Sequence, residues 1–229
     1  MKKHLAKIFD HAYARNTKNI LLLLDKQRAA QFLDLGCDDG TLSLALAKRI
    51  NTKDISGVEI DGTAAIHAVK RGIKVKQFDL NKQFDFTNDS FDVVHANQII
   101  EHLYDADNFL SEIHRILKPS GYAIISTENA SSWCNIFASV MGWQIFSLTN
   151  MSTIGSLGNP WSLYRNTIKK PASWIHIRIY NFRGLKELIQ AHGFVIEEIR
   201  GAGYFPFPAG MGNIDKTHAH FMAFKVRKK

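Results

Sequence analysis

The chain has 229 residues, of which 45% are hydrophobic and 22% charged, and its formal net charge is +8. This length and composition suit one globular domain with a sizeable core, and they exclude a disordered, collagen-like or disulfide-stapled chain. Two cysteines, Cys37 and Cys134, are too few for a disulfide framework or a four-cysteine zinc site. No apolar run approaches the roughly 18 residues of a membrane-spanning helix, so we expect a soluble, cytoplasmic protein.

The positive charge is distributed unevenly along the chain. Seven basic residues lie at the two ends, and without them the rest of the chain has a net charge of only +1. Basic ends are usually solvated, so the charge by itself does not indicate a nucleic-acid partner. Residues 129–186 contain no Asp or Glu but hold six basic residues and all four tryptophans. We therefore expect this stretch to have a function of its own.

Helices and strands are predicted to alternate along the chain. A basic N-terminal segment, 1–28, holds a helix over 4–24. It is followed by strands over 31–35, 55–60, 74–78, 91–96 and 122–127, separated by helices over 41–50, 63–71 and 106–117. This alternation is typical of a parallel sheet with crossover helices. A helix over 185–191 and strands over 194–200 and 218–226 close the chain, and these last two strands are expected to pair antiparallel.

The turn after the first strand has the sequence Asp34-Leu-Gly36-Cys37-Asp38-Asp39-Gly40 and leads into a helix. A glycine-rich turn in this position lets a ligand approach the backbone. Its three carboxylates would repel a pyrophosphate by about 1–4 kcal/mol per pair, which disfavours a dinucleotide. A cationic nucleoside such as S-adenosylmethionine would be attracted. One of the two adjacent aspartates is also expected to cap the following helix.

Two further acids end the next two predicted strands. Glu59, followed by Ile60, lies about 20 residues after the turn, where an acid hydrogen-bonds ribose hydroxyls. Asp79 supplies a carboxylate for an exocyclic amine, and Leu80 an apolar contact for a ring. Each acid by itself is equally consistent with an ordinary strand end. Acids at three successive strand ends together indicate a nucleoside site.

With Phe91-Asp-Val-Val-His95-Ala-Asn97-Gln98-Ile-Ile-Glu101-His102-Leu and Leu117-Lys-Pro-Ser-Gly121, these residues resemble the class I S-adenosylmethionine-dependent methyltransferases. The resemblance is strong over 31–127 and looser beyond, and it departs at Asp38, where that family often has glycine. It implies an α/β, doubly wound, Rossmann-like fold with a seven-stranded, mostly parallel sheet and a terminal antiparallel strand. It also implies S-adenosylmethionine as cofactor and S-adenosylhomocysteine as product. The predicted cofactor site comprises Asp34, Gly36, Cys37, Asp38, Gly40, Glu59, Ile60, Asp79, Leu80, Asn97 and Gln98.

Methyl transfer requires a positioned acceptor and a route for one proton. The candidate bases are His102, beside Glu101, and His176 in the acid-free stretch, whereas His95 is expected to be structural. The Glu101-His102 pair is similar to that of ubiquinone-pathway O-methyltransferases and of metal-dependent, Hen1-type RNA 2′-O-methyltransferases. Gln98 stands where the latter have a carboxylate, and an amide binds magnesium less well, so no metal is predicted and RNA is disfavoured. A simply packed His102 is the alternative.

Residues 129–178 are predicted to form a substrate cap inserted into a single domain spanning 1–229. Helical spacing of Trp133, Ile136, Phe137, Val140 and Met141 indicates one apolar stripe, which packs on the sheet or a partner chain or contacts the acceptor. Anchoring of this helix in a membrane surface is less favoured because it has no basic face. The predicted acceptor contacts suit an anionic or amphiphilic molecule and are Trp133, Arg165, Lys169, Lys170, His176 and Arg178.

The sequence as a whole predicts an S-adenosylmethionine-dependent methyltransferase acting on an oxygen of a small, lipid-linked or sugar-linked metabolite. A looser similarity to methyltransferases of sugars and glycan ends supports this, carried by residues 126–129 and by the His176-x-Arg178-x-Tyr180 stretch. Two alternatives stay open: a Hen1-like RNA 2′-O-methyltransferase, and a non-catalytic subunit that binds the cofactor. The oligomeric state is not indicated, and a homodimer is one option.

Overall fold

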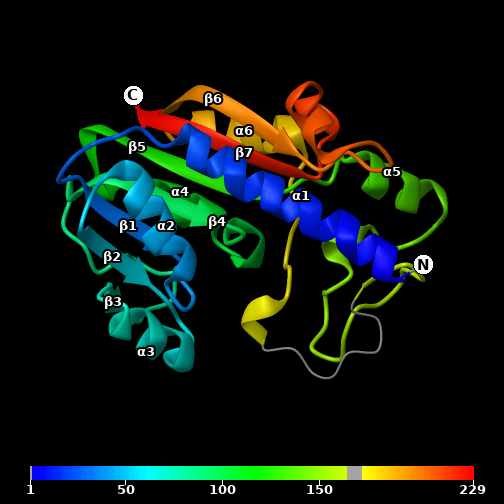
Figure 1. Ribbon diagram of the computed structural model, residues 1–229, viewed down its shortest axis with the longest axis horizontal. Helices are drawn as coiled ribbons and strands as arrows, with labels where there is room; N and C mark the ends of the chain where they lie inside the picture. Colours follow the sequence, from blue (N-terminus) through cyan, green and yellow to red (C-terminus); the bar gives the residue numbers. More distant parts are fainter. Residues whose placement is uncertain (1, 164–171) are drawn as a thin grey trace. The chain divides into compact units, whose positions relative to one another are not determined.

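The computed structural model describes residues 2–163 and 172–229 and contains one seven-stranded sheet (Figure 1). Its strands are β1 (Gln31–Leu35), β2 (Asp54–Val58), β3 (Lys74–Lys76), β4 (Phe91–Asn97), β5 (Leu117–Glu128), β6 (Phe194–Ala202) and β7 (Phe221–Lys228). The helices of the described residues are α1 (Lys2–Leu23), α2 (Thr41–Ile50), α3 (Gly62–Lys70), α4 (Ala106–Ile116), α5 (Trp133–Val140) and α6 (Phe182–Ala191), with several short 3₁₀ turns. None of these helices is both long enough and apolar enough to cross a membrane.

The strands are hydrogen-bonded in the order β3-β2-β1-β4-β5-β7-β6. The first five strands in this order pair in parallel. This confirms the predicted α/β, Rossmann-like fold with a seven-stranded, mostly parallel sheet. The order reverses at β1, which lies between β2 and β4, and ligands of open α/β sheets bind at the carboxyl edge of such a switch point.

Contacts divide the chain into two compact units. Unit 1 comprises Met1–Asn19, Thr127–Glu187 and Ile199–Ala223, and unit 2 comprises Ile20–Ser126, Leu188–Glu198 and Phe224–Lys229. The acid-free stretch 129–186 lies within unit 1. The bounds predicted for a single domain, for its N-terminal segment and for its cap stay predictions, because the units follow contacts rather than a function.

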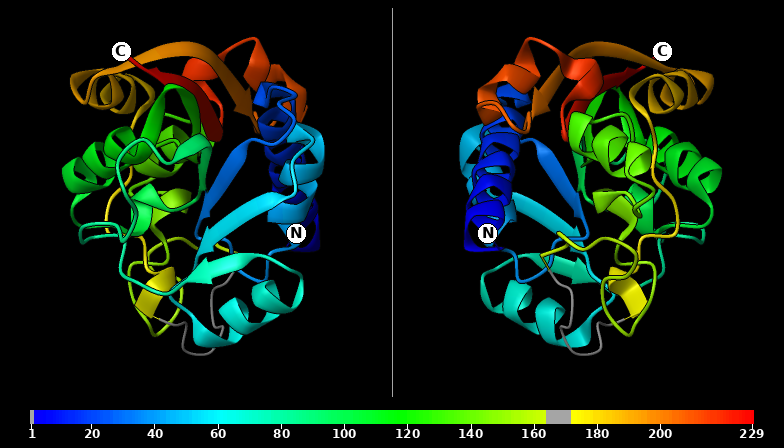
Figure 2. Two further views of the ribbon diagram at one scale, coloured as in Figure 1. Left: turned by 90° about the vertical axis from the view of Figure 1, so that its left-hand side faces the viewer. Right: turned by 90° about the vertical axis from the view of Figure 1, so that its right-hand side faces the viewer.

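Unit 2 is built on buried parallel strands. Phe32, Leu33 and Leu35 of β1 are fully buried, as are Val93 and Val94 of β4. A strand that is apolar on both faces is covered on both faces, as parallel strands with crossover helices require. Figure 2 shows α3 next to β2 and β3 in this unit.

The helices of unit 2 begin where side chains satisfy their free N–H groups. Asp61 accepts a hydrogen bond from the N–H of Ala64 at the start of α3, and Asp105 accepts one from Asn108 at the start of α4. Asp39 accepts one from the N–H of Thr41, so it supplies the capping interaction that the sequence predicted for one of two aspartates. The cap residue of α2 itself is Gly40.

Unit 1 is held together by contacts between segments far apart in the sequence. Phe9 and Ala12 of α1 pack against Phe221 at the start of β7. The buried amide of Asn19 donates to the carbonyl of Gly201, and that of Asn129 donates to the carbonyls of Thr217 and Ala219. These side chains satisfy carbonyl groups that would otherwise be buried without a donor, which a fold must do.

Several predicted bounds differ from the structure. β5 begins at Leu117, directly after α4, because Leu117 pairs with Phe91 before a register shift. The third strand is shorter than predicted and ends at Lys76. β7 begins at Phe221 and not at 218, because residues 216–218 form a 3₁₀ turn in which Asp215 accepts from the N–H of His218.

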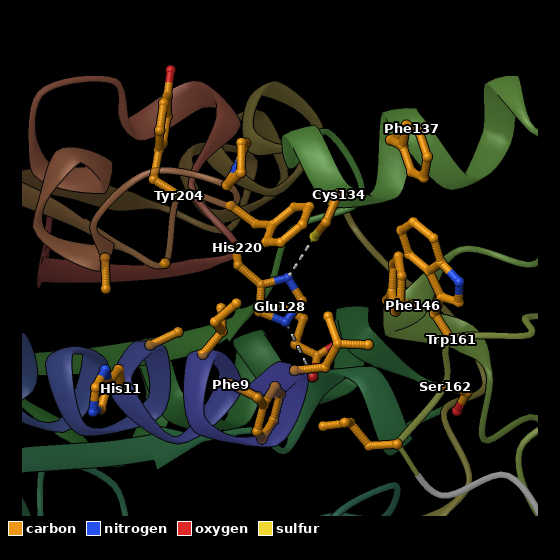
Figure 3. A pocket seen from close by; sticks show the side chains of 18 of the residues that line it. Phe9, His11, Glu128, Cys134, Phe137, Phe146, Trp161, Ser162, Tyr204 and His220 are labelled. Carbon is orange, nitrogen blue, oxygen red and sulfur yellow. Dashed lines mark hydrogen bonds and ion pairs between the residues drawn. The ribbon is translucent and has the colours of Figure 1, made fainter. Parts of the chain in front are cut away.

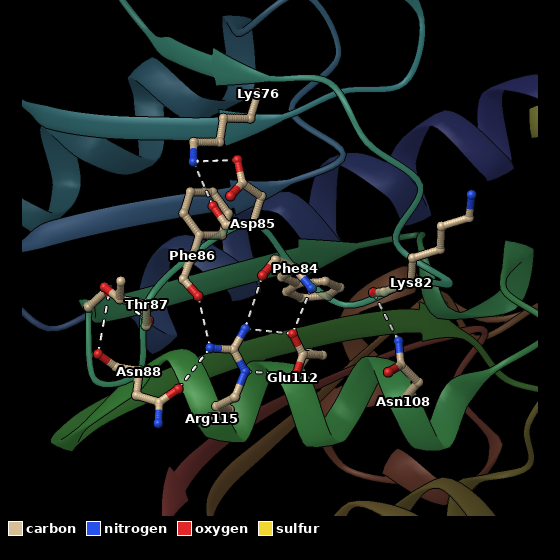
Figure 4. A network of polar contacts seen from close by, with 11 residues as sticks. Lys76, Lys82, Phe84, Asp85, Phe86, Thr87, Asn88, Asn108, Glu112 and Arg115 are labelled. Atoms are coloured by element: carbon tan, nitrogen blue, oxygen red, sulfur yellow. Dashed lines mark hydrogen bonds and ion pairs between the residues drawn. The ribbon is translucent and has the colours of Figure 1, made fainter.

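One ion pair on α4 fastens the loop between β3 and β4 (Figure 4). Arg115 donates to the carboxylate of Glu112, to the carbonyls of Phe84 and Phe86, and to the amide oxygen of Asn88. Glu112 also accepts from the N–H of Phe84. The hydrogen bond from Arg115 is the main reason that the pKa of Glu112 is lowered.

We expect Arg115→Ala to lower the free energy of unfolding by about 2–3 kcal/mol, because the buried carboxylate of Glu112 and two carbonyls lose the guanidinium that donates to them. Chemical denaturation at pH 7 measures this, with the exposed Arg28→Ala as matched control, expected to change stability by no more than about 0.5 kcal/mol. Because the pKa of Glu112 is lowered in the fold, the loss should be full above its ordinary value and should shrink as the pH falls through the lowered one. Equal losses for the two variants would contradict this assignment.

Candidate functional site

The turn between β1 and α2 has a shape that only glycine accommodates at two positions. Gly36 has a φ of 76°, and a Cβ on it would lie 2.1 Å from Cδ1 of Ile99. Gly40 has a φ of 82°, and its Cβ would lie 2.5 Å from Cδ1 of Ile73. Asp38, where the resembling family often has glycine, is itself left-handed, with a φ of 47°. The turn therefore depends on left-handed backbone at Gly36, Asp38 and Gly40, and the approach of a ligand to this backbone stays a prediction.

Glu59 joins this turn to the loop after β2. Its two carboxylate oxygens accept hydrogen bonds from the N–H groups of Asp38, at 2.9 Å, and Asp61, at 2.8 Å. Each carboxylate oxygen can accept a second hydrogen bond, so Glu59 can hold the turn and a ligand hydroxyl at once. Ile60, next along the chain, is 58% exposed and offers an apolar surface at the same edge.

Asp34, a predicted cofactor ligand, lies inside the fold. Its buried carboxylate accepts from the hydroxyl of Ser43 and pairs with Nδ1 of His95 at 2.7 Å. Both oxygens are thus used to tie β1 to α2 and β4, and His95 has a packing role, as expected. Cys37 is buried too, and burial raises the pKa of its thiol to about 12, so it is not a thiolate at neutral pH.

The loop after β3 presents Asp79 and Leu80. Oδ1 of Asp79 accepts from the backbone and side-chain N–H groups of Asn81, which holds the carboxylate in place. Leu80 is buried, with 9% of its surface exposed. Asp79 keeps its second oxygen for a further donor.

Gln98, directly after β4, combines two features of a ligand-binding position. Its φ of 57° is rare for a residue other than glycine, and such backbone strain gathers at functional sites. Its side-chain nitrogen is buried and has no hydrogen-bond partner among the described residues. A buried donor without a partner requires an explanation, and a ligand oxygen is one. Asn97 ends β4, and Glu101 and His102 follow in the 3₁₀ turn Ile100–His102.

The parallel register brings most of the predicted cofactor residues to one edge of unit 2. Leu35 pairs with Val58 and with Ala96, and Val58 pairs with Lys76, so the carboxyl ends of β3, β2, β1 and β4 coincide. The loops that follow these strand ends contain Gly36, Glu59, Asp79 and Gln98. Glu101 and His102 belong to this unit as well.

The predicted acceptor residues belong to unit 1, where the structure describes three of them. Nδ1 of His176 lies 2.6 Å from the carbonyl oxygen of Ser147. Trp133 is 43% exposed, and Arg178 is half-buried. Arg165, Lys169 and Lys170 lie outside the described residues. The predicted preference for an anionic acceptor, which depends on those three, stays a prediction.

Unit 1 encloses a cavity of about 550 Å³ (Figure 3). Much of its lining is apolar and aromatic, but Glu128 at the end of β5 and His220 just before β7 face each other in it. Nε2 of His220 lies 3.9 Å from Oε1 of Glu128, and its Nδ1 lies 3.4 Å from Sγ of Cys134. His176 lines the same cavity.

Burial governs the protonation of these groups. Desolvation raises the pKa of Glu128 to about 7, although a hydrogen bond with Ser147 opposes it. Desolvation, helped by the nearby His176, lowers the pKa of His220 to about 4. Burial also raises the pKa of the Cys134 thiol to about 11. At neutral pH the cavity therefore holds neutral imidazole on His220, a neutral thiol and a carboxyl close to its midpoint of titration.

The sequence prediction missed Glu128 and His220 as site residues. One signal was present for Glu128, because it ends the fifth strand and directly precedes the acid-free stretch. No local pattern marks His220, since its neighbours in the cavity come from distant parts of the chain. The apolar stripe of α5 is only partly covered, since Val140 is 80% and Met141 50% exposed, whereas Asn135 and Ala138 are buried. Its contact with the sheet, a partner chain or the acceptor stays a prediction.

We expect Glu128→Gln to make stability less dependent on pH. Folding raises the pKa of Glu128 from 4.5 to about 7, so the folded state holds its proton more tightly, and stability from this group falls between pH 4.5 and 7 by about 3 kcal/mol. The free energy of unfolding of the variant, relative to that of the wild type, should rise over that interval and stay constant above it. Thermal or chemical denaturation from pH 4.5 to 8.5 measures this.

The difference between variant and wild type in the free energy of unfolding is the quantity to compare, because other ionisable groups line the cavity. These are His4, His11, Cys134, His176 and His220. Their contributions appear in both proteins. The exposed Glu187→Gln, also in unit 1, is the control and should show a difference that does not vary with pH. If the stability difference for Glu128→Gln were also independent of pH, this would contradict a raised pKa of Glu128 in the folded protein.

Comparisons with known proteins agree with this fold. Residues 6–199 match a family model described as a methyltransferase domain. Curated relatives include two ubiquinone biosynthesis O-methyltransferases. That of Pseudomonas aeruginosa strain UCBPP-PA14 is 28% identical over 127 residues, and that of Rickettsia prowazekii strain Madrid E is 31% identical over 121 residues. These matches cover 53% and 49% of this chain and 54% and 48% of the relatives, so the chain spans about half the length of the curated relatives it matches.

Similar solved structures cover nearly all of the chain. A methyltransferase of Thermotoga maritima, described as a possible histamine N-methyltransferase, has a TM-score of 0.65 and 20% identity and covers 99% of this chain and 94% of its own. An S-adenosylmethionine-dependent methyltransferase of Mesorhizobium loti has a TM-score of 0.61 and 17% identity, with 92% and 96% covered. A Haloferax volcanii methyltransferase solved with its Trm112 activator has a TM-score of 0.64 and 15% identity, with 92% and 87% covered. The match over most of its length shows that the chain belongs to the methyltransferase domain family, whose class I members use S-adenosylmethionine as methyl donor.

Proposed function

We propose that the protein transfers a methyl group from S-adenosylmethionine to an oxygen of a small, lipid-linked or sugar-linked metabolite. The observation that carries this proposal is the set of features after four neighbouring parallel strands: the left-handed turn at Gly36, the carboxylates of Glu59 and Asp79, and the buried amide of Gln98. A site that only fills space has no need of all four. Curated relatives named as O-methyltransferases support oxygen as the methylated atom.

These residues suit a nucleoside that carries positive and not negative charge. Glu59 and Asp79 can accept from ribose hydroxyls and an exocyclic amine, and Ile60 and Leu80 can contact a ring. Asp38 and Asp39 in the turn would repel phosphate and attract an ammonium or sulfonium group. The nitrogen of Gln98 is the one donor in this set and suits a carbonyl or carboxylate oxygen.

When bound, the cofactor supplies an electrophilic methyl group, so the protein has to place the acceptor oxygen and remove its proton. The proton of the acceptor hydroxyl would pass to a side chain of the protein as the oxygen takes up the methyl group. His102 and His176 are the proposed bases, and Glu101, next to His102, would orient it. Positioning supplies the rest of the rate enhancement.

We expect Gly36→Ala to weaken cofactor binding at least tenfold. The added methyl group meets Ile99 at a backbone angle that side chains rarely adopt, so the turn must move away from its binding conformation. Gly72→Ala is the matched control, because Gly72 has a similar φ of 88° but open space around its Cβ position. Calorimetric titration with S-adenosylhomocysteine measures both affinities. Equal affinities of the two variants would place the cofactor elsewhere.

We expect radiolabel from S-adenosylmethionine to enter a small or lipid-soluble product when the protein is incubated with a metabolite extract, and RNase treatment to leave this labelling unchanged. His102→Gln or His176→Gln should keep cofactor affinity and lose about 10²- to 10⁴-fold in rate, the usual contribution of a base. Labelling that RNase abolishes would favour RNA as acceptor. Activity lost on chelation would favour a metal-dependent reaction, and full cofactor binding without any labelled product would favour a non-catalytic subunit.

A further inference from the structure

The cavity of unit 1 adjoins a second hollow on the same unit. This second hollow, of about 620 Å³, is lined by Trp133, Phe137, Trp161, Tyr204, Phe205, Pro206 and Phe207. All of these except Trp133 also line the cavity that holds Glu128. The two spaces are therefore neighbours separated by shared side chains. We call the first the polar cavity and the second the apolar groove.

The apolar groove is built from aromatic side chains that the fold leaves in water. Phe207 is 57% and Phe137 38% exposed. The ring of Phe137 stacks on Trp161 at 5.6 Å, with an interplanar angle of 21°. Exposed aromatic residues gathered in one hollow mark a binding surface more often than an accident of folding. What binds there must be apolar along its length.

Polar contacts hold one wall of the groove in place. Nε1 of Trp133 donates to the hydroxyl of Tyr204 at 2.9 Å, and that hydroxyl donates to Asp215. The indole of Trp133 also stacks on His218 at 4.4 Å. A groove whose walls are fixed before binding loses little conformational entropy when a ligand arrives.

The polar cavity offers hydrogen bonds to a head group. Glu128 and His220 face each other at 3.9 Å, too far for a hydrogen bond between them. The hydroxyl of Ser156 lines the cavity and is buried, and it has no partner in the part of the chain that the structure describes. None of the lining residues described there is Lys or Arg. A group with hydroxyls could donate to Glu128 and accept from Ser156, whereas an anion would face a carboxylate without a cation.

We propose that unit 1 binds an amphiphile, with an uncharged hydroxylated head in the polar cavity at Glu128 and an apolar chain along the apolar groove. Calling this molecule the methyl acceptor rests on the proposed function, but its binding does not. The net charge of unit 1 is +9, from 13 basic and 4 acidic residues. The described lining of the polar cavity holds no Lys or Arg, so a head group there meets the carboxyl of Glu128 without a neighbouring cation from those residues.

Alkyl glucosides of increasing chain length test the proposal in the absence of cofactor. Hexyl, heptyl and octyl glucoside, each below its critical micelle concentration, are titrated at pH 8 with calorimetry or tryptophan fluorescence as readout. We expect affinity to rise about three- to fourfold per methylene, as burial of a chain in an apolar groove requires. Phe207→Ser should flatten this dependence, and Ile214→Ser, an 83% exposed residue outside both spaces, should leave it unchanged.

Matched heads on one chain test the polar cavity. At pH 8 we expect octyl glucoside to bind at least tenfold more tightly than octyl sulfate, because Glu128 is then ionised. Glu128→Gln should narrow this ratio by improving the binding of the sulfate. If that variant does not fold, Ser156→Ala, which should weaken the glucoside alone, replaces it. Tighter binding of octyl sulfate or of octyltrimethylammonium by the wild type, or affinity independent of chain length, would overturn the proposal.

The two proposals fail in different ways. Glucosides that bind as described while no extract yields a methylated product would leave the amphiphile site standing and remove the proposed function. If the protein does not bind the glucosides but forms a labelled product that has no apolar chain, the proposed function would stand and the amphiphile site would be removed.

Discussion

The parallel pairing of β1 with both β2 and β4 is the constraint on which the cofactor edge of unit 2 depends. It brings the ends of four strands into line, so loop residues as far apart in the sequence as Gly36 and Gln98 lie at one edge. The buried carboxylate of Asp34 fastens this arrangement, since it binds Ser43 of α2 and His95 of β4 at once. A buried charge is tolerated when hydrogen bonds satisfy it, and here those bonds also fix the position of the strand that carries the turn.

The acids of this region make different contacts and therefore have different roles. Asp34 is buried inside the fold, Asp39 holds the start of α2, and the partly exposed Glu59 spans two loops while keeping capacity for a ligand. The sequence presents these carboxylates as equals. Only their burial and their partners separate a structural acid from one that can meet a cofactor.

In unit 1, burial changes the protonation of a carboxyl group, that of Glu128. There a carboxyl is placed among aromatic side chains without a neighbouring Lys or Arg in the described lining, and its pKa rises to about 7 for that reason. The exposed apolar stripe of α5 lies in the same unit. Helical spacing correctly indicated an amphipathic helix, but Asn135 is the side that packs inward, donating to the carbonyl of Asn129 and the hydroxyl of Ser147.

The sequence by itself determined the α/β fold, the order of most elements and the main features of the cofactor turn. Hydrophobic runs, helix-capping residues and glycines at forced backbone angles are local properties, and Gly36, Gly40 and Glu59 lie within or close to them in the chain. Tertiary structure alone decided that β7 lies between β5 and β6, that Asp34 is inside the fold, and that Glu128, Cys134 and His220 share a cavity. Such outcomes depend on which distant segments exclude water from one another, and no local pattern of residues records that.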